Sequence, residues 1–294
     1  MGHEVQDPAL ARIASLRPDG ASGVGHDAAE HCRSCGPVAY RDDMGKTVMI
    51  TGAGSCFGRA AAIALAARGH RVIATTETDD HVEELRAEAP ELTVERVDIT
   101  TDDVSKVDAW DVDVLINNAG IGQTGPLADV PIDRVRSLFE VNVFGTLAVT
   151  QRVLKSMVPK GSGRIIIMSS ISGVISAPTF GPYAMTKHAL EAMGKAMRME
   201  LAPLGIDVTL LNPGPFQTGF NDRMADSMWE WFGDHSLNSS TTDVFRMIGQ
   251  MVTGTQSDPA EVAQRMVELT EAETTEENNF VPPELRAQLG GNLG

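Results

Sequence analysis

The sequence Lys46-Thr-Val-Met-Ile-Thr-Gly-Ala-Gly-Ser-Cys-Phe-Gly58 decides the fold of this chain. The apolar run Lys46–Thr51 predicts a strand, and the alanine-rich segment that ends at Arg68 predicts a helix. Between them lies a glycine loop, Gly52–Gly58. Glycine lets the main chain turn tightly and approach a phosphate, while the N-terminus of the following helix offers oriented N–H groups. A glycine loop between a first strand and a first helix is typical of a pyrophosphate site for a dinucleotide.

The same alternation of apolar strands and amphipathic helices continues along the chain to about Val281. Strands that are apolar on both faces and separated by helices form parallel βαβ units. We therefore predict an α/β fold, a Rossmann-like doubly wound parallel sheet with helices on both faces. The further strands are expected at Arg71–Thr76, Leu92–Val97, Val112–Asn117, Arg164–Ser169 and Asp207–Asn212, and the further helices at Asp79–Glu88, Ile132–Met157 and Pro182–Leu204.

Composition divides the chain into two parts. Residues 1–43 are rich in Gly, Ala, Asp and His and show no persistent period, which predicts a flexible N-terminal extension. Cys32 and Cys35 lie beside His31 there, and this spacing can bind zinc. A structural zinc site normally needs four ligands in a small folded module, so we favour a polar tail with incidental thiols and expect no metal. Residues 44–294 are expected to form a single Rossmann-type domain.

Charge and apolar content exclude several classes of partner. The chain of 294 residues carries 24 Lys and Arg against 40 Asp and Glu, a net charge of −16, which argues against a nucleic-acid partner. The longest apolar runs, such as Ala60–Ala67, fall far short of the ~20 residues that cross a bilayer. No secretory signal is evident, and three Cys in such a chain indicate a reducing compartment. We expect a cytoplasmic protein without a membrane partner.

The tip of the second strand indicates which dinucleotide is bound. An acidic group there hydrogen-bonds the free ribose hydroxyls of NAD, whereas a basic group receives the 2′-phosphate of NADP. The stretch Thr75-Thr76-Glu77-Thr78-Asp79-Asp80 offers carboxylates and no base. We therefore predict NAD over NADP, with Thr76 and Glu77 at the cofactor. Two alternatives stay open: the acids cap the next helix, or Arg59 turns toward a phosphate.

Four polar residues form a candidate catalytic set. Tyr183 and Lys187 are four residues apart on a predicted helix and so share one face. A phenol titrates near ~10, and a neighbouring ammonium is expected to lower that pKa toward neutrality. Ser170 follows a strand at the carboxyl edge of the sheet, and Asn142 interrupts an apolar helical run. Each residue taken singly also fits a plain helix-surface pair or a helix cap.

Together these residues resemble the short-chain dehydrogenase/reductase family, in its single-domain branch. The resemblance runs from about Lys46 to Thr218, with weaker support to Val281. It rests on motifs that occur in the family's order: Thr51-Gly52 with Gly58, Asp98-Ile99, Asn117-Asn118-Ala119-Gly120, Asn142, Ser170, Tyr183 with Lys187, and Pro213-Gly214 with Thr218.

The resemblance implies a role for each member of the catalytic set. Tyr183 would be the general acid/base at the carbonyl or alcohol oxygen, and Ser170 would hydrogen-bond that oxygen. Lys187 would lower the pKa of the tyrosine and hold the nicotinamide ribose. Asn142 would hold a water that links the lysine to a proton relay.

The cofactor-binding set combines the glycine loop, the second-strand tip and the matched motifs. One position departs from the family, because Cys56 stands where its loop has glycine. Either a small residue is tolerated there, or the thiol makes cofactor binding sensitive to oxidation. The predicted set is Gly52, Ser55, Cys56, Phe57, Gly58, Thr76, Glu77, Asp98, Ile99, Asn118, Ala119, Gly120, Tyr183, Lys187, Pro213, Gly214, Phe216 and Thr218.

In the family, the stretch that matches about 215–240 is a mobile lid over the substrate. Its aromatic and methionine side chains here indicate a small hydrophobic alcohol or ketone. The alternative is that they pack on a neighbouring helix or on another subunit. The residues concerned are Phe216, Phe220, Met224, Met228, Trp229, Trp231 and Phe232, with Val174, Ile175 and Phe180 expected on the same pocket wall.

These expectations converge on one function. The chain would be an NAD(H)-dependent oxidoreductase that interconverts a secondary alcohol and its ketone. An NADP-dependent carbonyl reductase and a non-catalytic nucleotide-sensing regulator are the alternatives. By analogy with relatives, the helices Ile132–Met157 and Pro182–Leu204 would form the faces of a homodimer or homotetramer.

Overall fold

The central feature of the protein is a sheet of seven parallel strands in the order β3-β2-β1-β4-β5-β6-β7. The computed structural model describes residues 45–289, and the expected extension at 1–43, with Cys32 and Cys35, lies outside the described residues. The predicted Rossmann-like α/β fold is confirmed. The strands are β1 (Thr47–Ile50), β2 (Arg71–Thr76), β3 (Thr93–Arg96), β4 (Val114–Asn117), β5 (Gly163–Met168), β6 (Ile206–Pro213) and β7 (Asn278–Val281).

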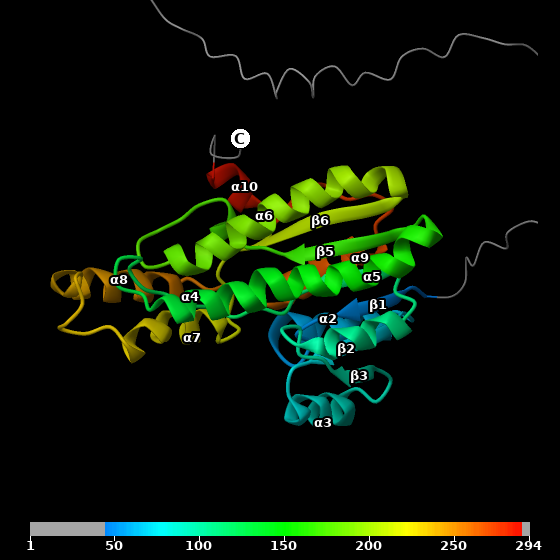
Figure 1. Cartoon of the computed structure of the whole chain (residues 1–294), viewed down its shortest axis with the longest axis horizontal. Helices are drawn as coiled ribbons and strands as arrows, with labels where there is room; N and C mark the ends of the chain where they lie inside the picture. Colours follow the sequence, from blue (N-terminus) through cyan, green and yellow to red (C-terminus); the bar gives the residue numbers. More distant parts are fainter. Residues whose placement is uncertain (1–44, 290–294) are drawn as a thin grey trace, which may run out of the picture. The chain divides into compact units, whose positions relative to one another are not determined.

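Helices cover both faces of the sheet (Figure 1). Successive residues of a strand face opposite sides, so Val48 and Ile50 of β1 pack into one core and Met49 into the other. The first core includes α2 (Cys56–Ala67), α3 (Asp79–Glu88) and α9 (Ala260–Glu271). The second includes the 3₁₀ segment η1 (Asp102–Ala109), α5 (Thr146–Lys160) and α6 (Gly181–Leu201).

The expected helix Ile132–Met157 is not continuous. It consists of α4 (Ile132–Phe139), a π-helical turn η2 (Glu140–Gly145) and α5. Within the turn, the buried Asn142 side chain exchanges hydrogen bonds with the backbone of Ile121, at 2.8 and 2.9 Å. A π turn of this kind commonly marks a functional site, and here it coincides with a tertiary contact that the helical period does not reveal.

The remaining α-helices belong to the C-terminal part of the chain, after β6. They are α7 (Phe220–Asp226), α8 (Thr242–Thr253) and α10 (Glu284–Gln288). Across residues 45–289, no helix has both the length and the apolar character that crossing a membrane requires.

A buried carboxylate fixes α6 to the last three strands of the sheet. Glu191 is 5% exposed and accepts hydrogen bonds from Ser169 Oγ (2.6 Å) and from Asn212 Nδ2 (2.6 Å). Asn278 Nδ2 donates to its other oxygen at 2.7 Å. These donors follow or belong to β5, β6 and β7, so one side chain sets the height of α6 against the carboxyl edge.

Replacing Glu191 by Leu should lower the free energy of unfolding by about 3 kcal/mol, because two buried donors, Ser169 and Asn212, and the half-buried Asn278 lose their acceptor. Chemical denaturation of the apo-protein measures this loss. The matched control is Glu268→Leu, since Glu268 is an exposed residue paired with Arg265 at 3.0 Å and should contribute less than about 1 kcal/mol. Equal losses in the two variants would contradict the anchoring role.

Candidate active site

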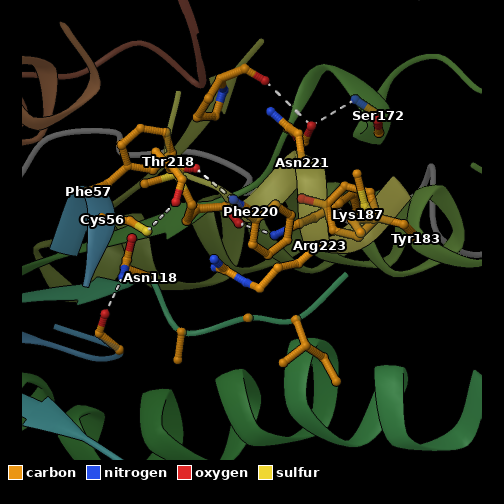
Figure 2. Close-up of a pocket in the computed structure, with 18 of the residues that line it drawn as sticks. Cys56, Phe57, Asn118, Ser172, Tyr183, Lys187, Thr218, Phe220, Asn221 and Arg223 are labelled. Atoms are coloured by element: carbon orange, nitrogen blue, oxygen red, sulfur yellow. Dashed lines mark hydrogen bonds between the residues drawn. The ribbon is translucent and has the colours of Figure 1, made fainter. Parts of the chain in front are cut away.

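A cavity of about 610 Å³ opens where the carboxyl ends of β1, β2, β4, β5 and β6 meet. Figure 2 shows ten of its residues labelled, from the glycine loop at Cys56 to Tyr183 and Lys187 of α6. Of the cofactor and catalytic residues expected from the sequence, all but Gly58 and Asn142 line this cavity. Topology therefore brings together segments that lie more than a hundred residues apart in the chain.

The glycine loop has the shape and polarity of a diphosphate cradle. Gly52 adopts a left-handed φ of +64°, and a Cβ there would lie 2.7 Å from the Cα of Ala119. Asn118 Nδ2 donates to the carbonyls of Thr51 and Gly52 at 3.0 Å each, which holds the loop after β4 against the glycine loop. The first turn of α2 contains no acidic residue, so its amide end is open to an anion. These residues fit a dinucleotide cofactor.

Gly58 has a packing role behind the loop. A Cβ at this position would lie 2.5 Å from Asn118 Nδ2 and 2.7 Å from the carbonyl oxygen of Gly52. Only glycine allows α2 to approach the loop so closely.

Cys56 has a backbone conformation that favours glycine. Its φ is 53°, in the left-handed region that a residue with a Cβ rarely adopts. The thiol donates a weak hydrogen bond to the carbonyl of Thr218 at 3.3 Å. The side chain thus connects the glycine loop with the loop after β6. Whether oxidation of this thiol affects cofactor binding stays a prediction.

A cation that the sequence pattern did not reveal, Arg96, lies beside the tip of β2. Arg96 Nε donates to the carbonyl of Glu77 at 3.1 Å and lies 3.9 Å from Asp79. Arg96 ends β3, and the parallel register pairs it with Thr76. It is twenty residues away in the sequence, so only the register of β2 and β3 could have revealed it.

The other basic candidate at this tip is engaged elsewhere. Arg59 contacts Glu84 at 3.5 Å and Glu88 at 2.6 Å, both on α3. The acids Asp79 and Asp80 lie in the first turn of α3, as the capping alternative expects.

Tyr183 and Lys187 lie one turn apart near the start of α6. Pro182 occupies the first turn, where its missing N–H costs nothing. The Lys187 ammonium lies 5.5 Å from the centroid of the Tyr183 ring and donates to the carbonyl of Met168 at 2.8 Å. Both side chains are buried, at 7% and 4% exposure. Ser170, at the end of β5, accepts a hydrogen bond from the amide of Ser172 at 3.1 Å.

Burial shifts both titrating groups toward their neutral forms. Burial raises the pKa of Tyr183, and the Ser170 hydroxyl offsets this only in part. Burial also lowers the pKa of Lys187 to about 8, although the Glu191 carboxylate opposes the change. Burial therefore outweighs the expected effect of Lys187, and the pKa of Tyr183 is raised where the sequence predicted that it would fall. The phenol therefore keeps its proton at neutral pH.

Asn142 lies behind the cavity rather than in it. Besides its two bonds to Ile121, its Nδ2 donates to Thr186 Oγ1 at 3.1 Å. Thr186 precedes Lys187 on α6, so Asn142 connects the loop after β4 with that helix. These contacts use both hydrogens of Nδ2 and one acceptor position of Oδ1.

The apolar part of the cavity comes from α7, α8 and the segment before α6. Phe220 and Met224 line it, as do Ile175 and Phe180, and the Phe220 ring lies 5.8 Å from the Tyr183 ring. Sequence analysis missed the α8 contribution, although its apolar residues recur at helical spacing. These residues are Ile248, Met251 and Val252.

Several residues expected on the pocket wall lie elsewhere. Met228 and Trp229 line a second, smaller cavity of about 320 Å³. Trp231 and Phe232 pack with Phe245 of α8, so for them the alternative of packing on a neighbouring helix is correct. Val174 does not line the main cavity.

Comparison with known proteins agrees with this geometry. Similar proteins include Uncharacterized oxidoreductase YbbO from Escherichia coli (strain K12), 38% identical over 191 residues, or 62% of this chain and 70% of that protein. Uncharacterized oxidoreductase YusZ from Bacillus subtilis (strain 168) is 36% identical over 239 residues, or 76% of this chain and 84% of that protein. A solved short-chain dehydrogenase from Streptomyces avermitilis has a TM-score of 0.73 and 31% identity, and covers 85% of this chain and 93% of its own.

The sequence model of the short chain dehydrogenases matches residues 46–229, which is more than half of the chain. The match begins just before β1 and extends through the glycine loop, Ser170 and the Tyr183–Lys187 pair to η5 (Ser227–Glu230). With the sheet order and the cleft at its carboxyl edge, this match makes the chain a member of the short-chain dehydrogenase family of oxidoreductases.

Proposed function

We propose that this protein is an NAD(H)-dependent oxidoreductase that interconverts a hydrophobic secondary alcohol and its ketone, with Tyr183 as the general acid/base. The observation that carries the proposal is the Tyr183–Lys187 pair on one turn of α6, in the same cavity as the glycine loop. A proton donor and a phosphate cradle in one cleft are what a hydride-transfer enzyme needs.

In the proposed mechanism, each residue has one task at the reacting oxygen. The bound nicotinamide supplies or accepts the hydride. During reduction, the Tyr183 phenol protonates the carbonyl oxygen, and Ser170 donates a hydrogen bond that stabilises its developing charge. The raised pKa of Tyr183 keeps the phenol protonated at neutral pH, which suits reduction. Oxidation needs the phenolate, so its rate should rise with pH.

Lys187 and Asn142 are proposed to support this proton transfer indirectly. The Lys187 ammonium is proposed to hold the nicotinamide ribose of a bound cofactor and to favour the phenolate of Tyr183. Asn142 is proposed to keep Thr186, and with it the helix that carries Lys187, in register with the loop after β4. Its expected contact with a relay water is part of the proposal.

Glu77 supports NAD as the preferred cofactor. It lines the cavity at the end of β2, where a carboxylate accepts hydrogen bonds from ribose hydroxyls and repels a 2′-phosphate. Asp98, another lining residue, adds a second carboxylate to this end of the cleft. The NADP-dependent alternative is supported by Arg96, the guanidinium group at the carbonyl of Glu77.

The remaining assignments are extensions of this proposal. Residues 44–294 would act as one domain, with about 215–240 as the lid over a small hydrophobic substrate. Large apolar side chains are exposed on the helices where a homodimer or homotetramer would form. They include Ile132 on α4, Phe144 in η2, and Met185 and Met199 on α6. We keep the cytoplasm as the proposed compartment.

Tyr183→Phe should lower kcat for a responsive secondary ketone at least about 100-fold, because only the proton donor is removed. The dissociation constant for NADH, measured by fluorescence titration, should stay within about two-fold of wild type. Phe220→Tyr is the control. It changes the aromatic ring beside Tyr183 and leaves the Tyr183 phenol in place. A wild-type protein that binds NADH but turns over no member of a panel of secondary alcohols and ketones would instead support the nucleotide-sensing regulator.

Glu77→Gln should lower the ratio of kcat/KM with NADH to kcat/KM with NADPH by about ten-fold, since the neutral amide accepts more weakly from the ribose hydroxyls and no longer repels the 2′-phosphate. Asp79→Asn is the matched control. This substitution removes the same charge from the next helix, at a residue that does not line the cavity. A wild-type preference for NADPH that Arg96→Gln abolishes would contradict the choice of NAD.

Lys187→Met should make the apo-protein more stable at pH 7 while abolishing turnover. Lowering the pKa of Lys187 from 10.5 to about 8 means that the buried ammonium destabilises the folded state by about 3 kcal/mol. The variant also loses the hydrogen bond to the carbonyl of Met168, which lowers its stability by about 1 kcal/mol. The free energy of unfolding should therefore rise by about 2 kcal/mol in total.

The pH dependence of stability independently tests whether the buried Lys187 ammonium destabilises the folded protein. Between pH 8 and 10.5 the unfolded chain holds a proton that folded Lys187 has lost, so wild-type stability should rise with pH relative to Lys187→Met. Below pH 8 the difference should be constant. Denaturant melts of both proteins across this range measure it, and a variant less stable than wild type at pH 7 would refute the argument.

A further inference from the structure

Arg223, on α7, brings a cation into the cleft that none of the assignments above uses. Among the residues that line the cavity, Arg223 and Lys187 are the two Lys or Arg side chains. Lys187 is buried and bonded to the carbonyl of Met168, whereas Arg223 is exposed. Arg223 is therefore the accessible cation of this site.

The Arg223 guanidinium has no carboxylate partner among residues 45–289. The ion pairs within this part of the chain engage most other arginines, such as Arg59, Arg134 and Arg198. The neighbouring acid Asp222 instead accepts a hydrogen bond from Gln256 at 3.3 Å. In a chain with a net charge of −16, an arginine left without an internal anion is available for an external one.

The guanidinium lies on the glycine-loop side of the cleft. Its Nη1 is 2.9 Å from the position that a Cβ on Gly219 would occupy. Gly219 follows Thr218, whose carbonyl accepts the thiol hydrogen bond of Cys56. In Figure 2 the Arg223 side chain points toward Cys56 and Asn118 and away from Tyr183 and Lys187. It is thus directed at the phosphate cradle and not at the reacting oxygen.

We propose that Arg223 binds the diphosphate of the dinucleotide from the α7 side, opposite the amide end of α2. The inference rests on the proposed function in that a nicotinamide dinucleotide occupies the cleft. A planar guanidinium can bond two phosphate oxygens at once. The other charged side chains that line the adenosine end, Glu77 and Asp98, are acidic and would repel a diphosphate. Arg223 offsets that repulsion and ties α7 to the cofactor.

The test uses Arg223→Gln with two companions. Arg223→Lys keeps the charge without the bidentate geometry. Arg246→Gln removes the same charge from the adjacent helix α8, where Arg246 lies 4.5 Å above the Trp229 ring and outside the main cavity. Dissociation constants for NADH and NADPH come from fluorescence titration, and those for ADP-ribose and adenosine from competition. Melting temperatures establish that the variants fold.

Arg223→Gln should weaken binding of the dinucleotide and of ADP-ribose by at least about ten-fold. Adenosine, which lacks the diphosphate, should bind as to wild type. Arg223→Lys should recover part of the loss, and Arg246→Gln should stay within about two-fold. The salt dependence of dinucleotide affinity should also become shallower in Arg223→Gln, because one phosphate contact is lost.

Other outcomes overturn the inference in distinguishable ways. Equal dinucleotide affinity in wild type and Arg223→Gln would refute the role of Arg223 alone. An Arg223→Gln protein whose only change is a higher KM for an anionic substrate would refute it as well. An equal loss for adenosine and ADP-ribose would show an indirect effect through α7. Wild-type protein that binds neither NADH nor NADPH would refute the proposed function as well.

Discussion

The position of α6, the helix that carries Tyr183 and Lys187, depends on the Glu191 carboxylate. Glu191 lies one turn after Lys187 and two turns after Tyr183 on α6, so these three side chains share one helical face. Its hydrogen bonds reach Ser169 and Asn212, at the carboxyl ends of β5 and β6, and Asn278, the first residue of β7. A helix held only by apolar packing could slide along the sheet, because packing is less directional than a hydrogen bond. The carboxylate fixes the height at which the phenol and the ammonium enter the cleft.

Burial of the Tyr183–Lys187 pair has opposite consequences for stability and for the proposed chemistry. A desolvated ammonium and a desolvated phenol both favour their neutral forms, which is why the pKa of Lys187 falls to about 8 and that of Tyr183 rises. The folded apo-protein therefore holds a charged group where an apolar one would be more stable. Such local cost is typical of a functional site and not of a core position. The Glu191 carboxylate reduces this cost, because it favours the charged form of Lys187.

The sequence was most informative where local pattern and tertiary structure agree. The strand Arg71–Thr76 and the helix Asp79–Glu88 were predicted with the ends that the structure shows. The glycine loop, Ser170, Tyr183 and Lys187 could be predicted to share one edge because parallel strands place their carboxyl ends together. The π turn at Asn142, the guanidinium of Arg96 at Glu77 and the α8 side of the cavity depend on contacts between distant segments. Neither periodicity nor motif spacing contains that information.

The substitution of glycine by Cys56 connects the two halves of the cleft. A left-handed residue with a Cβ strains the loop by about 1 kcal/mol or more, so the surrounding structure must hold it in place. The thiol contact with Thr218 is one such restraint, and it joins the glycine loop to the segment that leads into α7. Arg223 extends from that same helix toward the same loop. A diphosphate bound between them would contact both segments. The glycine loop of this chain is therefore best understood together with α7 and not as a separate motif.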